Sequence, residues 1–149
     1  METLFVTLHV VAAVFLVGPM AILPMTGLRA IRAGQLALAK TLARSTFVTS
    51  LLSLLVVLFG FAALGMSDPK DHFSIATPWI WISLLAYLVA LALILFLVVP
   101  ALNKAAARPQ PDAASASVSS EGGYGSIAAG SGIASLLLVL VVVLMVWKP

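Results

Sequence analysis

The sequence has no cysteine and little charge, with 8 Lys and Arg and 5 Asp and Glu among 149 residues. The missing cysteines exclude disulfides, thiolate metal sites and cysteine nucleophiles within this chain. A water-soluble domain of this length would be about a quarter charged. Here 9% of the residues are charged and 62% are hydrophobic. Lipid must therefore be the solvent for most of the chain, and the class is that of an integral membrane protein.

Four apolar stretches are long enough to cross a bilayer as helices. They are residues 4–27, 46–66, 78–102 and 127–147, and crossing about 30 Å of hydrocarbon takes roughly 20 residues. None shows the alternation of a strand, and in hydrocarbon every backbone N–H and C=O must be paired internally. The sequence predicts an all-α polytopic membrane protein, a single transmembrane domain built as a four-transmembrane-helix bundle.

The connections between these stretches differ in composition. Residues 28–45 hold four bases and no acid, and Gly34 suits the C′ position that ends the first helix. Residues 67–77 form a short turn with two acids. Residues from about 105 to 126 are rich in Ala, Ser, Gly and Pro, which is typical of a flexible linker.

The distribution of Lys and Arg predicts the orientation. With the N-terminus outside, six bases fall inside and two outside, because charges left in the cytoplasm need not cross against the membrane potential. The six are Arg29, Arg32, Lys40, Arg44, Lys104 and Arg108, and the two are Lys70 and Lys148. Trp79, Trp81 and Trp147 then lie at the outer boundary, which indoles prefer. We predict a protein of the bacterial cytoplasmic (inner) membrane with both termini outside.

Small and hydroxyl-bearing residues are expected to pack the helices. In the fourth stretch, small residues recur four positions apart, as Ala128/Gly132, Gly130/Ala134 and Ser131/Ser135. Such spacing lets helix backbones approach closely. In the second stretch, an inward stripe is predicted from Thr46, Ser50, Ser53 and Gly60. We favour ordinary helix packing over a pore or a binding groove.

Three prolines lie within the apolar stretches, Pro19 and Pro24 in the first and Pro100 in the third. Each removes a backbone N–H and frees the carbonyl four residues earlier. Broken helices can build binding sites at the bilayer midplane. We predict kinks at these prolines, with a binding site as the alternative.

Three segments together resemble a known family. They are "LHVVAAVFLVGP" (residues 8–19), "PWIWISLLAYLVALALILFLVVP" (78–100) and the terminal "LMVWKP" (144–149). They are similar to small bacterial four-helix proteins known as predicted integral membrane proteins of unknown function. The resemblance covers the bundle without the 105–126 loop, and it implies a four-helix fold.

His9 followed by Gly18 is also remotely similar to the first helix of two other groups. These are the copper-resistance D-type membrane proteins and the HemJ-type protoporphyrinogen oxidases, which carry a helix-one histidine. The HemJ-type group binds b-haem. The chain departs from that pattern, because the first helix and the turn after it hold no second histidine, and His72 lies in a loop. We expect no cofactor, with haem b bound by His9, together with His72, as the alternative.

His9 is the ionisable residue within the apolar stretches, roughly 8 Å below the outer boundary. Three interpretations compete: a neutral histidine hydrogen-bonded to a neighbouring helix, a haem or copper ligand, and a quinone, proton-relay or lipid-headgroup contact. A metal site could recruit His72, Asp71, Asp68 or Glu2, but their spacing matches no ligand motif, so no metal site is expected. Tyr87 is expected to pair with a neighbouring helix.

Catalytic arrangements are absent from the sequence. The spans hold no acid, and the chain has no Gly-rich phosphate loop, HExxH or GxSxG motif. The bases Arg29, Arg32, Lys40 and Arg44 are expected to meet anionic membrane lipids or an acidic partner, or to act as topology determinants alone. No nucleic-acid partner is expected, because a basic balance in a membrane protein reports topology first.

These observations favour a non-enzymatic accessory or stabilising subunit docked on a larger membrane complex, with a respiratory complex as a candidate. The alternative is a b-haem- or metal-binding membrane redox protein that uses His9. A small transporter or channel is a weaker third hypothesis, because no polar lining is evident.

Overall fold

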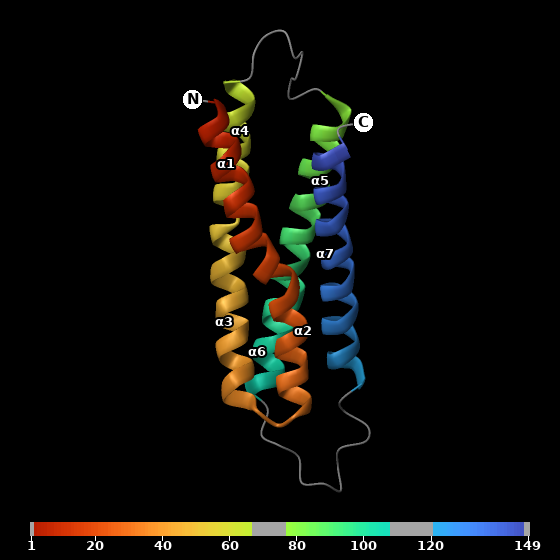
Figure 1. Cartoon of the computed structure of the whole chain (residues 1–149). Helices are drawn as coiled ribbons and strands as arrows, with labels where there is room; N and C mark the ends of the chain where they lie inside the picture. Colours follow the sequence, from red (N-terminus) through yellow and green to blue (C-terminus); the bar gives the residue numbers. More distant parts are fainter. Residues whose placement is uncertain (1, 67–76, 108–120, 148–149) are drawn as a thin grey trace, which may run out of the picture.

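A computed structural model describes residues 2–66, 77–107 and 121–147 of the chain. Its helices combine into four long apolar helices, which we call spans 1 to 4, and the described residues contain no strand. Span 1 comprises α1 (Glu2–Ala12), the π-helix η1 (Ala13–Val17) and α2 (Gly18–Arg32), and span 2 comprises α3 (Leu36–Leu52) and α4 (Leu54–Gly65). Span 3 comprises α5 (Pro78–Ala92), the π-helix η3 (Leu93–Val98) and α6 (Val99–Ala107), and span 4 is α7 (Glu121–Trp147). The predicted all-α four-helix transmembrane architecture is confirmed (Figure 1).

The spans alternate in direction, so charge separates along the bundle. The start of α1 and the ends of α4 and α7 lie at one end, and the turn after α2 lies at the other (Figure 1). This second end, which we call the basic end, carries every Lys and Arg that the described ranges contain. These residues are Arg29, Arg32, Lys40, Arg44 and Lys104. The opposite end carries the three tryptophans, of which Trp79 is buried while Trp81 and Trp147 are exposed.

The turn between spans 1 and 2 is much shorter than the predicted connection of residues 28–45. Helix α2 continues to Arg32 and α3 begins at Leu36, because the Ala- and Leu-rich flanks have high helix propensity. Gly34 ends the first span as predicted, with φ of 72°. Gln35 N–H donates to the carbonyl of Ala30 over 2.9 Å, and Gly34 N–H donates to that of Ile31 over 3.0 Å. These two bonds form a Schellman motif and satisfy carbonyls at the helix end.

The predicted linker of residues 105–126 is also too long at both ends. Helix α6 extends to Ala107 and α7 begins at Glu121. Residues 108–120 lie outside the described part of the chain, as do residues 67–76 of the predicted short turn.

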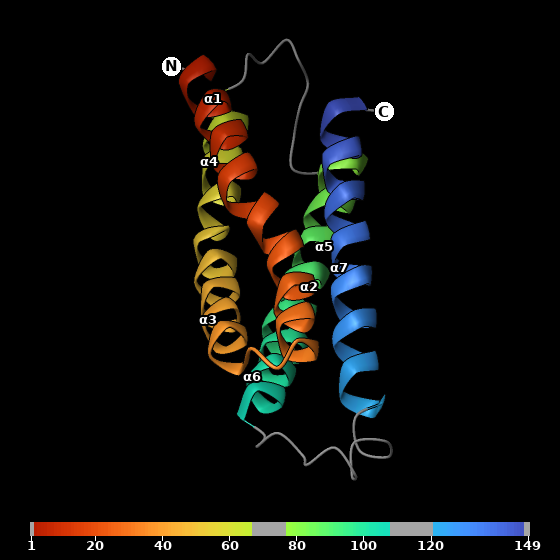
Figure 2. The same cartoon turned by 60° about the horizontal axis from the view of Figure 1, so that its bottom comes forward.

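Two of the three prolines follow irregular helix. Pro19 comes two residues after η1, where Gly18 N–H donates to the carbonyl of Ala13, five residues back. Pro100 comes two residues after η3. Because proline has no N–H and its ring displaces the carbonyl four residues earlier, a π-turn re-pairs the backbone just before it. Span 1 bends at η1, as predicted (Figures 1 and 2), whereas Pro24 lies within a regular α2.

These two irregular segments share a sequence. Residues 15–19 read Phe-Leu-Val-Gly-Pro and residues 96–100 read Phe-Leu-Val-Val-Pro. Phe15 is 71% exposed and Phe96 is 81% exposed, so both rings point out of the bundle. A π-helix that ends two residues before a proline thus occurs once in span 1 and once in span 3, which run in the same direction.

Span 4 packs through its small residues. A Cβ on Gly130 would lie 2.7 Å from Leu97 Cδ2 and 3.1 Å from Val98 Cγ2. Glycine at this position therefore allows η3 to pack closely against α7. Ser131 and Ala134 are buried on the same face, whereas Gly132 has open space around it. The predicted packing through small residues is therefore confirmed for one face of α7. Gly132 does not belong to that face.

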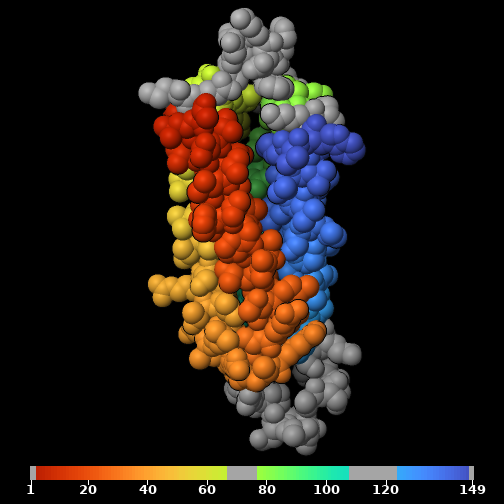
Figure 3. All heavy atoms as spheres, in the orientation of Figure 1, coloured from red at the N-terminus to blue at the C-terminus, as the bar shows by residue number. Residues whose placement is uncertain are grey.

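Packing is uneven along the bundle. Toward the basic end all four spans meet, since α2 packs on α3 and α7, and α3 packs on α6. In the opposite half, α1 packs on α4 and α5 packs on α7. The backbones of the two pairs come close at few points, although Val57 of α4 packs against the apolar cluster that includes Tyr87 and Leu91 of α5. Figure 3 shows the surface hollowed between α1 and α7, with α5 visible behind. In the most apolar stretches of spans 1 and 2, 11% and 17% of residues are buried, against 44% and 28% in spans 3 and 4.

Candidate functional site

His9 of α1 joins the backbone of α4. Its Nδ1 lies 2.7 Å from the carbonyl oxygen of Val56. A carbonyl only accepts hydrogen bonds, so Nδ1 carries the hydrogen and donates it. In a neutral ring Nε2 then holds a lone pair. The structure thus contains the hydrogen bond to a neighbouring helix that one of the three interpretations of His9 requires.

Gly60 makes room for the imidazole. A Cβ at this position would lie 3.0 Å from His9 Cε1 and 3.1 Å from His9 Nδ1. A larger residue would force the ring to shift by a few tenths of an ångström, at the atoms that face the carbonyl of Val56 one turn earlier on α4. The glycine in the predicted stripe of span 2 therefore serves the contact with span 1.

A hydroxyl pair joins spans 2 and 3 near the middle of the bundle. Ser53 Oγ lies 2.7 Å from the Tyr87 hydroxyl oxygen and 2.6 Å from the carbonyl oxygen of Ser50. Because Ser53 has a single hydroxyl hydrogen and gives it to that carbonyl, Tyr87 must donate to Ser53. The expected pairing of Tyr87 with a neighbouring helix is confirmed.

Other hydroxyls line the interior. Thr46, Ser50 and Ser53 are fully buried, which confirms the inward stripe of span 2 for these three residues. Ser135 donates to the carbonyl of Ala21 over 3.0 Å and so joins α7 to α2. The hydroxyls of Ser50 and Ser83 are buried without a hydrogen-bond partner. Thr46 and Ser53 donate to carbonyls of their own helix, those of Leu42 and Ser50, which is the behaviour of packing residues.

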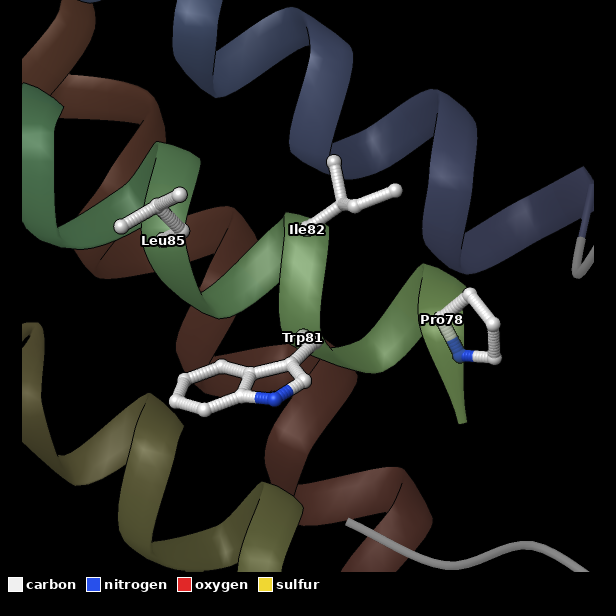
Figure 4. Close-up of a pocket in the computed structure, with 4 residues that line it drawn as sticks. All are labelled: Pro78, Trp81, Ile82 and Leu85. Atoms are coloured by element: carbon white, nitrogen blue, oxygen red, sulfur yellow. The ribbon is translucent and has the colours of Figure 1, made fainter. Parts of the chain in front are cut away.

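One shallow cavity of about 470 Å³ lies on α5 (Figure 4). It is lined by Pro78, Trp81, Ile82 and Leu85, all from this helix. Figure 4 shows Trp81 and Ile82 on opposite sides of the helix. A surface of this composition suits acyl chains or an apolar helix, and these four residues supply no acid, base or nucleophile.

A groove of about 730 Å³ runs along the surface between α3 and the segments η3 and α6 at the basic end. Lys40 and Arg44 line it together with Asn103. Of the other predicted lipid- or partner-binding bases, Arg32 lies over the Tyr124 ring, 6.0 Å from its centroid, and Arg29 is exposed on α2. The structure thus brings two of the four bases together. Asn103 was not singled out in the sequence, because its register against α3 requires the packed structure.

The proposed cofactor ligands fall only partly within the described residues. His72, Asp68 and Asp71 lie outside them, and so does the side chain of Glu2. Among the residues that are described, no three His, Cys, Asp or Glu side chains are close enough to hold a metal ion. Haem binding by His9 therefore remains a prediction.

Comparison with known proteins identifies a family. The sequence model of a family described as "Predicted integral membrane protein (DUF2269)" matches residues 3–149. No curated protein and no solved structure matches the chain. The family match spans all four helices and agrees with the membrane architecture.

Proposed function

The chain belongs to the DUF2269 family of predicted integral membrane proteins, and we propose that it is a non-enzymatic accessory subunit that docks on a larger membrane complex and stabilises it. The observation that carries this proposal is the separation of the α1–α4 pair from the α5–α7 pair. We propose that a helix of the partner packs on the α1–α4 pair and fills the hollow beside it.

The physical argument concerns how helices associate in lipid. Acyl chains are as apolar as leucine, so helices are held by close packing and interhelical hydrogen bonds. A bond from His9 to Val56 joins the two helices of the α1–α4 pair, and Val56 is the one residue of the pair that is buried among those described. Large side chains such as Val10 and Leu58 are exposed. A further helix would give them the close contacts that the remaining spans do not.

We further propose that the basic end faces the cytoplasm in a bacterial inner membrane. The five described bases at that end support this orientation through the positive-inside rule. The partner class suggested by the resemblance to haem-binding membrane proteins is a respiratory complex.

The proposal is tested by comparing two leucine variants. Leu58 on α4 is 61% exposed and Leu136 on α7 is 71% exposed. Each is replaced by tryptophan, which lipid tolerates but a packed helix interface does not. The protein is then extracted from its own membrane in mild detergent, and its native mass and copurifying subunits are measured. We expect a large assembly with wild type and Leu136→Trp, and its loss with Leu58→Trp. A wild-type protein that migrates as a single chain would contradict the accessory role.

A second candidate function, haem or metal binding through His9, is favoured by one observation. A histidine that donates Nδ1–H to a carbonyl leaves Nε2 free to ligate, and ligating histidines commonly have such a second bond. The test is the visible absorption spectrum and metal content of the purified protein. A Soret band in wild type that is lost in His9→Gln would support this function, and a colourless, metal-free protein would contradict it.

A further inference from the structure

The groove at the basic end is built from two spans, and we call it the α3–α6 groove. Its residues from span 2 are Ala37, Lys40, Thr41, Ala43, Arg44 and Phe47, and those from span 3 are Leu95, Val99, Pro100 and Asn103. Its volume of about 730 Å³ is larger than that of the cavity on α5.

Polarity changes along the length of this groove. On α3, Lys40 and Arg44 are followed by Phe47, at positions i, i+4 and i+7, which share one helix face. Span 3 runs the other way, so polar Asn103 lies toward the basic end and apolar Leu95 lies deeper. At 1.5 Å per residue, the seven positions from Lys40 to Phe47 cover about 10 Å. The groove is therefore cationic at its mouth and apolar inside, along the direction of the helices.

The two cations have no acidic partner on the helices that form the groove. The five acids of the chain are Glu2, Asp68, Asp71, Asp112 and Glu121, so none belongs to α3 or α6. Lys40 and Arg44 are both exposed. By contrast, Arg32 at the same end lies over an aromatic ring. Among the side chains that the structure describes, the positive charge at the mouth of the groove thus has no acidic counterpart.

We propose that the α3–α6 groove binds one acidic phospholipid. Lys40 and Arg44 hold the phosphate, and one acyl chain lies along Phe47, Leu95 and Val99. Asn103 offers a hydrogen bond to the polar head, whereas Thr41, whose hydroxyl donates to the carbonyl of Ala37 over 3.1 Å, can accept one from a hydroxyl of that head. A phospholipid has this order of charge and hydrocarbon, and basic pockets between transmembrane helices suit anionic head groups. A soluble anion would leave the apolar half of the groove unused, and an acidic peptide would have to enter the bilayer to reach it.

The test uses the full-length protein in detergent with three probes of defined chemistry. The first is dioleoyl phosphatidylglycerol, the second is dioleoyl phosphatidylcholine, and the third is glycerophosphoglycerol, the same anionic head without acyl chains. Native mass spectrometry counts bound lipid, and thermal unfolding gives the concentration for half-maximal stabilisation. We expect one tightly retained phosphatidylglycerol, weaker binding of phosphatidylcholine, and no stabilisation by glycerophosphoglycerol.

Two matched double variants are compared, and each removes two positive charges from the basic end of the bundle. Lys40→Gln/Arg44→Gln should weaken phosphatidylglycerol binding by roughly fivefold for each charge, or about 25-fold in all. Arg29→Gln/Arg32→Gln should weaken it less than about twofold, because these residues do not line the groove. Equal losses in both double variants would overturn the proposal in favour of diffuse attraction. Equal binding of phosphatidylcholine, or stabilisation by glycerophosphoglycerol, would overturn it as well.

Discussion

The imidazole of His9 donates a hydrogen bond to the backbone carbonyl of Val56 over 2.7 Å and thereby joins α1 to α4. This contact lies in the half of the bundle where α1 and α4 pack closely on each other and their backbones come near α5 and α7 at few points. Gly60 provides the space that the ring needs. The imidazole thus has a structural role, because it joins the pair of helices that we propose as the docking surface.

Replacing His9 should reveal how much this bond stabilises the fold. In His9→Gln the amide can still donate to the carbonyl of Val56, so the free energy of unfolding should change little. His9→Leu removes the donor and should lower it by about 0.6 kcal/mol, the average for interhelical hydrogen bonds in membranes. The free energy of unfolding of both variants is measured by titration with a denaturing detergent. Thr7→Val is the control, because the Thr7 hydroxyl donates within its own helix to Thr3. A His9→Leu protein as stable as wild type would show that the bond contributes nothing.

Gly60→Ala should disturb the same contact without touching the histidine. The new Cβ would lie 3.0 Å from His9 Cε1, so the ring would have to shift by a few tenths of an ångström and its bond to the carbonyl of Val56 would be strained. Gly65→Ala is the matched control on α4, since nothing lies within 4 Å of its Cβ position. Both changes gain helix propensity, so the difference between their unfolding free energies isolates the clash. We expect Gly60→Ala to be the less stable variant, and the difference to vanish when His9 is already leucine.

Tyr87→Phe should weaken the contact between spans 2 and 3. The phenyl ring keeps its packing, while Ser53 loses the hydrogen bond that it accepts. We expect a loss of about 0.6 kcal/mol in the free energy of unfolding. Ser83→Ala, one turn earlier on α5, is the control and should be neutral or stabilising, because its buried hydroxyl has no partner. The reverse order of the two variants would contradict the assigned pairing.

The orientation is tested by labelling single cysteines in intact cells with a reagent that does not cross the membrane. A cysteine at Gln35 lies in the turn at the basic end and should be protected, whereas one at Ser67 should be labelled. The reason is the concentration of Lys and Arg at the end that contains Gln35. Labelling at Gln35 with protection at Ser67 would invert the orientation.

Much of the fold is readable from the sequence, because each span must satisfy its own backbone in lipid. Hydropathy locates the four helices, and Gly34 marks the first turn correctly. The same hydropathy places the start of the second helix at residue 46 instead of Leu36, since helix continues beyond the hydrocarbon wherever Ala and Leu favour it. The shared Phe-Leu-Val-x-Pro segments are a visible signal for the two π-helices, and only the structure gives them that meaning.

The candidate sites depend on register and are less predictable. His9 stands out as an ionisable residue in lipid, but its acceptor is a backbone carbonyl, which no side-chain pattern reveals. The sequence does not distinguish Lys40 and Arg44 from the other bases of the same connection. They differ because they line a groove that forms only where α6 packs beside α3. The sparse backbone contact between the α1–α4 and α5–α7 pairs depends on how all four spans pack, so composition gives no sign of it.

Site-specific photo-crosslinking at Leu58 tests the docking surface most directly. A photoreactive amino acid replaces Leu58 on α4 or, as the matched control, Leu136 on α7, and whole cells are irradiated before extraction. We predict a covalent adduct of defined mass with one other membrane protein from position 58, and lipid adducts alone from position 136. Lipid adducts alone from both positions would contradict the accessory role.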